Sequence, residues 1–111
     1  MGSESSTVSN SIDGVHIRLT PERWSHIIAR HPEIEPYRSR ILETISNPDF
    51  VAKGDHGEFK AVKLFSDFPM GARYLIVMYR EVRADDGFII TARISSDMGN
   101  LLRGGIIWQK K

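Results

Sequence analysis

The sequence predicts an α+β domain in which helices pack on one face of an antiparallel sheet. Three observations favour this class. Two segments with apolar residues at helical spacing follow one short strand; the rest of the chain is rich in β-branched and aromatic residues; and short polar turns separate those later strands. Because the helices come early and the strands then follow in one run, the strands are expected to form a meander.

The composition is that of an ordinary globular domain. The chain has 111 residues, 41% of them hydrophobic and 26% charged, with a net charge of +1. We therefore expect one domain, 15–111, after a flexible, Ser-rich leader, 1–14. The longest apolar run, 74–79, is far shorter than the roughly 20 residues of a membrane-spanning helix, so no membrane partner is expected. The opening residues lack the apolar segment of a secretory signal, which predicts a cytoplasmic location.

The first elements are expected to be a strand and a helix. Apolar and polar residues alternate over 15–19, which is typical of a half-buried strand. The helix is expected to begin at Thr20, whose hydroxyl can cap free backbone amides, with Pro21 at its first position. It is expected to end near His31, because the residue before Pro32 is disfavoured in helical conformation.

A second helix is expected after Glu33, where one apolar stripe recurs at helical spacing until Asn47-Pro48 stops it. Strands are expected at 49–53, 58–65, 73–82, 88–94 and 106–108. Gly-Asp-His-Gly at 54–57 indicates a turn, and Asp-Asp-Gly at 85–87 indicates a hairpin.

This hairpin allows side chains to be assigned to faces of the sheet. If the loop of the hairpin has an even number of residues, the residue numbers of any two positions that face each other across the hairpin add up to an odd number. One face is then expected to carry Tyr74, Ile76, Met78, Arg80, Val82, Ile89, Thr91, Arg93 and Ser95. The opposite, apolar face, placed under the helices, is expected to carry Leu75, Val77, Tyr79, Ile90, Ala92 and Ile94. An odd loop or a bulge would change this assignment.

Arginines next to hydroxyl groups on the open face favour phosphate binding. The alternative is a solvated face on which arginine stems cover apolar neighbours. Ten of the 15 basic residues are Arg, whose planar fork suits phosphate better than the ammonium of Lys does.

The first helix carries two histidines with different surroundings. His31 falls on the apolar stripe with Trp24, so it is expected to be a half-buried structural histidine with most of its ring covered. His26 falls with Arg23 and Arg30 on a basic stripe, so its ring is expected to be accessible. The two histidines are five residues apart, the wrong spacing for two metal ligands on one helical face, and Cys is absent. No metal or other cofactor is expected.

Residues 23–33, Arg-Trp-Ser-His-Ile-Ile-Ala-Arg-His-Pro-Glu, resemble the opening of the small phage-associated nuclease-like domains of the barnase–EndoU–colicin–RelE (BECR) superfamily. The resemblance continues at 41–49, 73–81 and 87–92, and it covers roughly 15–108. It implies two N-terminal helices packed on one face of a curved antiparallel sheet of four to five strands. It also implies a metal-independent ribonuclease, either a toxin or a phage-associated effector. Its partners would be RNA and a protein inhibitor or antitoxin.

Carried over by position, the resemblance implies catalytic roles for His26, Arg30, His31, Arg80 and Thr91. The assignment of faces adds Arg93 and Ser95 as substrate-binding residues, and the basic stripe adds Arg23. The implied reaction uses the RNA 2′-OH as nucleophile, with a histidine that takes or gives the proton and an arginine that stabilises charge on the phosphate. The alternative is a non-catalytic RNA- or protein-binding module of the same fold.

Overall fold

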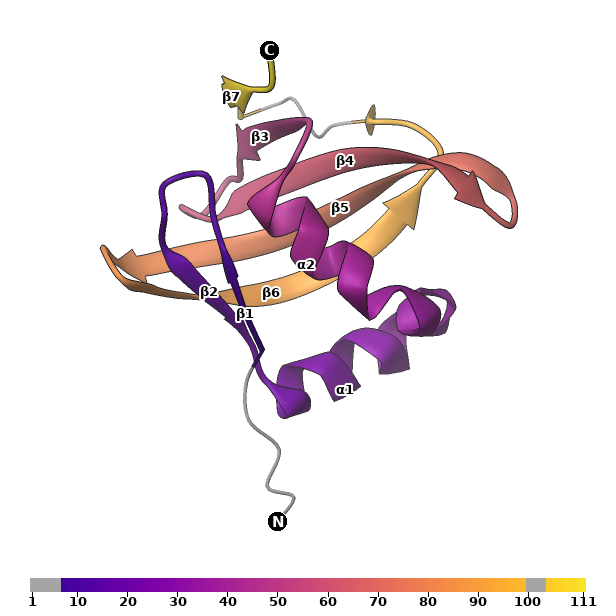
Figure 1. Cartoon of the computed structure of the whole chain (residues 1–111), viewed down its shortest axis with the longest axis horizontal. Coiled ribbons are helices and arrows are strands. Elements are labelled where there is room, and N and C mark those ends of the chain that lie inside the picture. Colours follow the sequence, from indigo (N-terminus) through magenta and orange to yellow (C-terminus); the bar gives the residue numbers. More distant parts are fainter. Residues whose placement is uncertain (1–6, 100–103) are drawn as a thin grey trace.

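The computed structural model describes residues 7–99 and 104–111, and its helices lie between the second and third strands of the chain (Figure 1). The elements are β1 (Thr7–Asn10), β2 (His16–Leu19), α1 (Pro21–Arg30), the 3₁₀ helix η1 (Pro32–Tyr37), α2 (Arg38–Ser46), β3 (Phe50–Lys53), β4 (Phe59–Phe68), β5 (Gly71–Arg83), β6 (Asp86–Ser95) and β7 (Ile106–Gln109). The expected strands are all present, with ends shifted by up to three residues.

The strands form one mixed sheet in the order β1-β2-β6-β5-β4-β3-β7. The expectation of two N-terminal helices on an antiparallel sheet of four to five strands is therefore wrong. β2 pairs in parallel with β6, with Ile17 opposite Gly87 and Arg18 opposite Phe88, whereas the other pairs are antiparallel. The alternation of a four-residue strand indicates that it is a strand but carries no information about its partner, which here is about 70 residues away.

The additional strand, β1, comes from the segment that was expected to be a flexible leader. It pairs with β2 and is held against α2 by side chains. The Ser9 hydroxyl donates to the Leu42 carbonyl at 2.7 Å, and Arg38 Nη2 donates to Thr7 Oγ1 at 2.7 Å. The polar sequence of β1 did not indicate a strand, because hydrogen bonds rather than buried apolar side chains attach β1 to the rest of the domain.

The expected start and end of the first helix are confirmed. The Thr20 hydroxyl accepts a hydrogen bond from the Arg23 amide at 3.0 Å, Pro21 occupies the first turn, and α1 ends at Arg30. The second expected helix is divided into η1 and α2, because Pro36 has no N–H for a regular α-helical bond.

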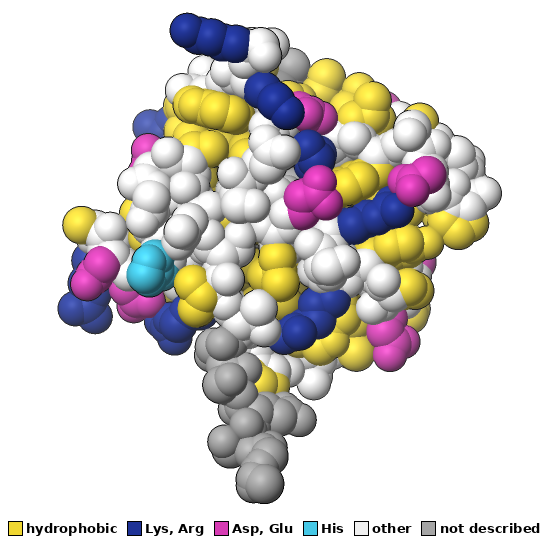
Figure 2. Space-filling view, viewed as in Figure 1, with side chains coloured by type: hydrophobic (Ala, Val, Ile, Leu, Met, Phe, Trp, Pro, Cys, Tyr) yellow, Lys and Arg dark blue, Asp and Glu magenta, His cyan; other side chains and the backbone are white. Residues whose placement is uncertain are grey.

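The main core lies between the helices and one face of the sheet. Its fully buried members include Ile17, Leu19, Ile27, Ile34, Ile41, Ile45, Val51, Ala61, Leu75, Val77, Tyr79, Ile89 and Ala92. A smaller cluster of Phe50, Val62 and Ile76 lies on the opposite face of the sheet. On the side that carries the helices, basic and acidic side chains are interspersed among apolar ones (Figure 2).

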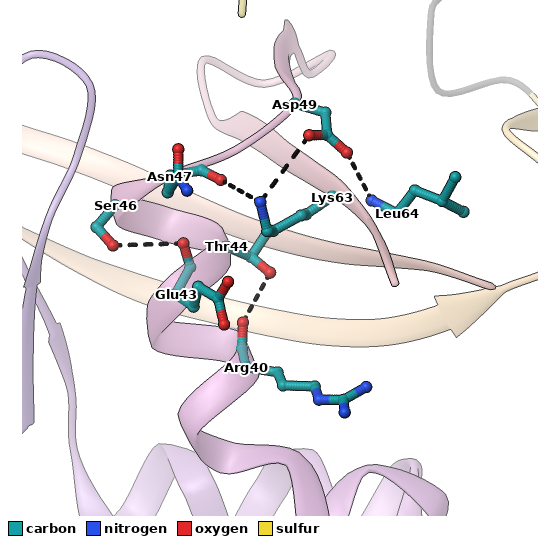
Figure 3. A network of polar contacts seen from close by, with 8 residues as sticks. All are labelled: Arg40, Glu43, Thr44, Ser46, Asn47, Asp49, Lys63 and Leu64. Atoms are coloured by element: carbon teal, nitrogen blue, oxygen red, sulfur yellow. Dashed lines mark hydrogen bonds and ion pairs between the residues drawn. The ribbon is translucent and has the colours of Figure 1, made fainter. Parts of the chain in front are cut away.

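Polar contacts attach the end of α2 to β4 (Figure 3). Lys63 Nζ donates to the Asn47 carbonyl at 3.0 Å and lies 3.9 Å from Asp49 Oδ1. Asp49 Oδ2 in turn accepts from the Leu64 amide at 2.8 Å. These contacts fix how α2 crosses the sheet.

Two register shifts in the β5–β6 hairpin change the expected faces. The expected odd sum holds at Arg83 opposite Asp86 and again at Met78 opposite Thr91. Between those pairs the register is displaced by one residue. Ile89, expected on the open face, is opposite Tyr79 and buried in the main core instead. A β-bulge places one extra residue in a strand, so the side chains beyond it point to the opposite faces from those that strict alternation predicts.

Candidate functional site

A hollow of about 370 Å³ lies between α1 and β6. It is lined by Arg23, His26, Ile27, Arg30, His31, Ile90 and Thr91. The pairs between β2 and β6 end at Phe88, and α1 packs beside the next part of β6. The hollow therefore lies where the short parallel strand stops and a helix takes its place beside the sheet.

The helix supplies the basic part of the lining because its residues follow helical spacing. Arg23, His26 and Arg30 are all exposed on α1, while Ile27 on the same helix is 1% exposed and anchors it to the core. The expected accessibility of His26 is confirmed. Amphipathic spacing thus sets the basic side chains at the surface next to β6.

His31 is half-buried, which agrees with the expectation of a partly buried histidine at this position. It caps the C-terminal end of α1 with φ of −132°, and its side chain is 32% exposed. Since the backbone leaves helical geometry there, the side chain no longer follows the apolar stripe of Trp24. The Nδ1 atom of His31 lies 3.7 Å from Oε2 of Glu33, which belongs to η1.

The lining is rich in positive charge. Within the described part of the chain, neither Arg23 nor Arg30 lies within 4.0 Å of a carboxylate. A second hollow of about 180 Å³ shares Arg23 and His26 with the first and is also lined by Thr20 and Glu22. Guanidinium groups without a carboxylate partner are suited to bind phosphate.

Five of the eight candidate site residues come together in the larger hollow: Arg23, His26, Arg30, His31 and Thr91. The other three, Arg80, Arg93 and Ser95, do not line it. Arg80 Nη2 donates to the His56 carbonyl at 2.9 Å, in the turn between β3 and β4. Arg93 is opposite Ile76 in the sheet, and the Ser95 hydroxyl donates to the Asp97 carbonyl at 2.6 Å. The hollow thus brings the helix histidines together with Thr91 but not with the sheet arginines.

The surroundings of Arg80 form a separate polar cluster. Glu58 Oε1 accepts from the His56 amide at 2.8 Å. The hydrogen bond from its own backbone amide lowers the pKa of Glu58 most, and the His56 amide and the charges of His56 and Arg80 lower it further, against the effect of burial. Arg80 therefore stabilises the turn that contains His56. The position of Arg80 in its strand did not predict this structural role.

Besides Ile27, which anchors α1 to the core, two residues at or beside the larger hollow were not among the candidates. Ile90 contributes apolar lining because the bulge displaces it from the main core. Glu33 contacts His31, and its place directly after the His-Pro pair is the sequence signal that could have identified it.

Comparison with known proteins finds no matching family model, no matching curated protein and no matching solved structure. Over residues 7–99 and 104–111, no three side chains of His, Cys, Asp or Glu are grouped as ligands for a metal ion. No helix in that part of the chain has the length and apolar character needed to cross a membrane.

Proposed function

We propose that the hollow between α1 and β6 is the active site of a metal-independent ribonuclease. One observation carries this proposal: two imidazoles and two guanidinium groups line the same hollow, which is also open to solvent at His26. Imidazole is the side chain best suited to exchange protons near neutral pH, and guanidinium is the best suited to bind phosphate.

The two histidines have different surroundings, which suggests different roles. His31 is half-buried beside Glu33, so we assign it as the base that takes the proton from the RNA 2′-OH. The 2′ oxygen then attacks phosphorus, and the bond from phosphorus to the 5′ oxygen breaks. The exposed His26 gives its proton to that leaving oxygen. The products are a 2′,3′-cyclic phosphate and a 5′-hydroxyl end.

The remaining residues of the lining bind the phosphate. Arg23 and Arg30 come from the same face of α1 as His26, so their charges act on one phosphate group near that imidazole. They stabilise the negative charge that develops on the phosphate oxygens as the nucleophile attacks. Thr91 lies on the β6 side of the hollow and supplies a hydrogen-bonding hydroxyl there.

The proposal is tested by incubating the protein with single-stranded RNA in EDTA and identifying the product ends. We expect 2′,3′-cyclic phosphate ends, and no cleavage of a matched strand that carries 2′-deoxyribose throughout. His26→Ala and His31→Ala should each reduce the cleavage rate by roughly 100-fold or more. The matched control is Arg83→Ala, which removes an exposed arginine at the far end of β5 and should leave the rate unchanged.

A further variant distinguishes the hollow from the surroundings of Arg80. Arg80→Ala removes a cation that does not line the hollow, so cleavage should persist. Loss of cleavage in Arg80→Ala with full activity in His26→Ala would move the site away from the hollow to the surroundings of Arg80. Salt-dependent RNA binding without any cleavage would favour the non-catalytic binding module.

A further inference from the structure

A carboxylate lies next to one imidazole of the proposed active site. Glu33 Oε2 is 3.7 Å from His31 Nδ1, and the Glu33 side chain is 45% exposed. Over the described residues, this is the one approach of a carboxylate to within 4.0 Å of a basic side chain that lines the larger hollow. Glu33 itself does not line that hollow, so it approaches the imidazole from outside it.

The chain between the two residues is firmly held. Pro32 restricts the backbone at the start of η1, and the Ile34 amide donates to the His31 carbonyl at 3.0 Å. The Ile34 side chain is fully buried in the main core. Because the residues on both sides of Glu33 are fixed, the approach of its carboxylate to His31 is set by an anchored turn.

We propose that Glu33 is a positioning residue that selects the tautomer of His31. This inference rests on the proposed function, in which His31 is the base. A neutral imidazole carries a proton on one nitrogen and a lone pair on the other, and a carboxylate can only accept. Glu33 therefore favours the proton on Nδ1 and leaves the lone pair of Nε2 free to take the proton of the 2′-OH.

The distance is compatible with this role. At 3.7 Å the two atoms are too far apart for a hydrogen bond, and a side-chain movement of about 1 Å brings them into hydrogen-bonding range. Such contacts in unliganded active sites are often long and shorten when the substrate binds. Other charged or titratable groups at the hollow, Arg23, His26 and Arg30, offer His31 no acceptor of comparable strength.

The test reads the tautomer directly, by ¹H–¹⁵N correlation of the imidazole ring nitrogens at about pH 8, where an ordinary imidazole is neutral. The signals of the His31 ring are identified as those that are missing from the spectrum of His31→Gln. We expect His31 of the wild type to be mainly the Nδ1–H tautomer, and Glu33→Ala to change it to the Nε2–H tautomer that free histidine prefers. Glu33→Gln should give a mixture, because an amide can offer either an acceptor or a donor. Glu35→Ala, an exposed acid of the same 3₁₀ helix, is the matched control and should change nothing.

The catalytic consequence is measured separately. Glu33→Ala should lower kcat roughly 10-fold to 100-fold and leave KM within about twofold, because Glu33 acts on His31 and not on the substrate. A wild-type His31 that is mainly Nε2–H, or a tautomer unchanged in Glu33→Ala, would overturn the inference. A wild type that holds the Nδ1–H tautomer, loses it in Glu33→Ala and yet cleaves no RNA would overturn the proposed function and leave the positioning by Glu33 established.

Discussion

The Ser11 hydroxyl donates a hydrogen bond of 2.7 Å to Glu81 Oε2 and so ties the loop between β1 and β2 to β5. The same oxygen of Ser11 accepts from the backbone amides of Asp13 and Val15, at 3.2 and 3.3 Å. Ser11 is 6% exposed. One buried hydroxyl thus organises the loop and attaches it to a carboxyl group near the end of β5, the central strand of the sheet.

Glu81 should make the protein less stable as the pH rises. Burial raises the pKa of its carboxyl most, the charge of Asp13 raises it further, and the Ser11 hydrogen bond opposes them. The folded state therefore binds a proton more tightly than the unfolded state, and this stabilisation is lost as the pH rises from about 4.5 through the folded pKa. Glu81→Gln should remove that loss. We expect urea unfolding at pH 4 to 8 to show the variant gaining stability relative to the wild type as the pH rises.

Ser11→Ala provides a check of opposite sign. It removes the hydrogen bond that lowers the pKa of Glu81, so stability should fall more steeply with rising pH than in the wild type. Parallel pH profiles of the wild type, Glu81→Gln and Ser11→Ala would show that Glu81 has no such role.

Asp86 should have the opposite pH dependence. Arg18 Nε and Nη2 donate to its two carboxyl oxygens at 2.8 and 3.2 Å, and this hydrogen bonding, with the charges of Arg18 and Arg83, holds the pKa of Asp86 below its usual value. The stabilisation of the folded protein by Asp86 is then present above about pH 4, and it is lost as the pH falls through the pKa that Asp86 has in the folded state. Thermal unfolding should show Asp86→Asn less stable than the wild type at pH 7, with the difference narrowing at pH 3. An equal difference at both pH values would contradict this.

Ile41 should be essential to the core. It is fully buried on α2 against the sheet, and truncation of a buried isoleucine leaves a cavity. We expect Ile41→Ala to lower the free energy of unfolding by about 2–5 kcal/mol. Ile107→Ala is the matched control, since Ile107 is 46% exposed and its truncation should cost less than about 0.5 kcal/mol. Urea titration of both variants measures the difference.

RNA affinity should depend on salt through the arginines of α1. Each phosphate contact on a single strand contributes roughly −0.7 to the slope of log affinity against log salt. Arg30→Ala should flatten the slope by about that amount, measured with a 2′-deoxy strand that cannot be cleaved by 2′-OH attack. Arg83→Ala should leave the slope unchanged, because Arg83 does not line the hollow. An unchanged slope in Arg30→Ala would exclude a phosphate contact by this residue.

Local signals in the sequence predicted the elements well. The Thr20-Pro21 cap, the Pro32 stop and the turn residues act on neighbouring backbone, so their effect is visible without knowledge of the fold. Pairing over long distances was not predictable in the same way. Nothing in β2 indicates that its neighbour is parallel β6, and nothing in β6 indicates that a bulge buries Ile89.

The candidate site was predictable to the extent that it lies on one helix. Arg23, His26 and Arg30 share a face because of helical spacing alone, and the hollow contains all three. Arg80 was placed with them only by resemblance, and its actual neighbour is a turn from another part of the chain. His31 was expected to be half-buried and is so, although helical spacing ceases to apply at this residue, which caps the helix.

The parallel contact of β2 with β6 has a consequence for how the chain reaches its native state. Ile17 and Gly87 meet across about 70 intervening residues, whereas the antiparallel neighbours β4, β5 and β6 follow one another along the chain. Local hairpins form faster than contacts that close a long loop. During synthesis, the residues of β1 and β2 leave the ribosome long before those of β6, the neighbour of β2 in the sheet. We therefore expect the α1 side and the β6 side of the hollow to come together late in folding.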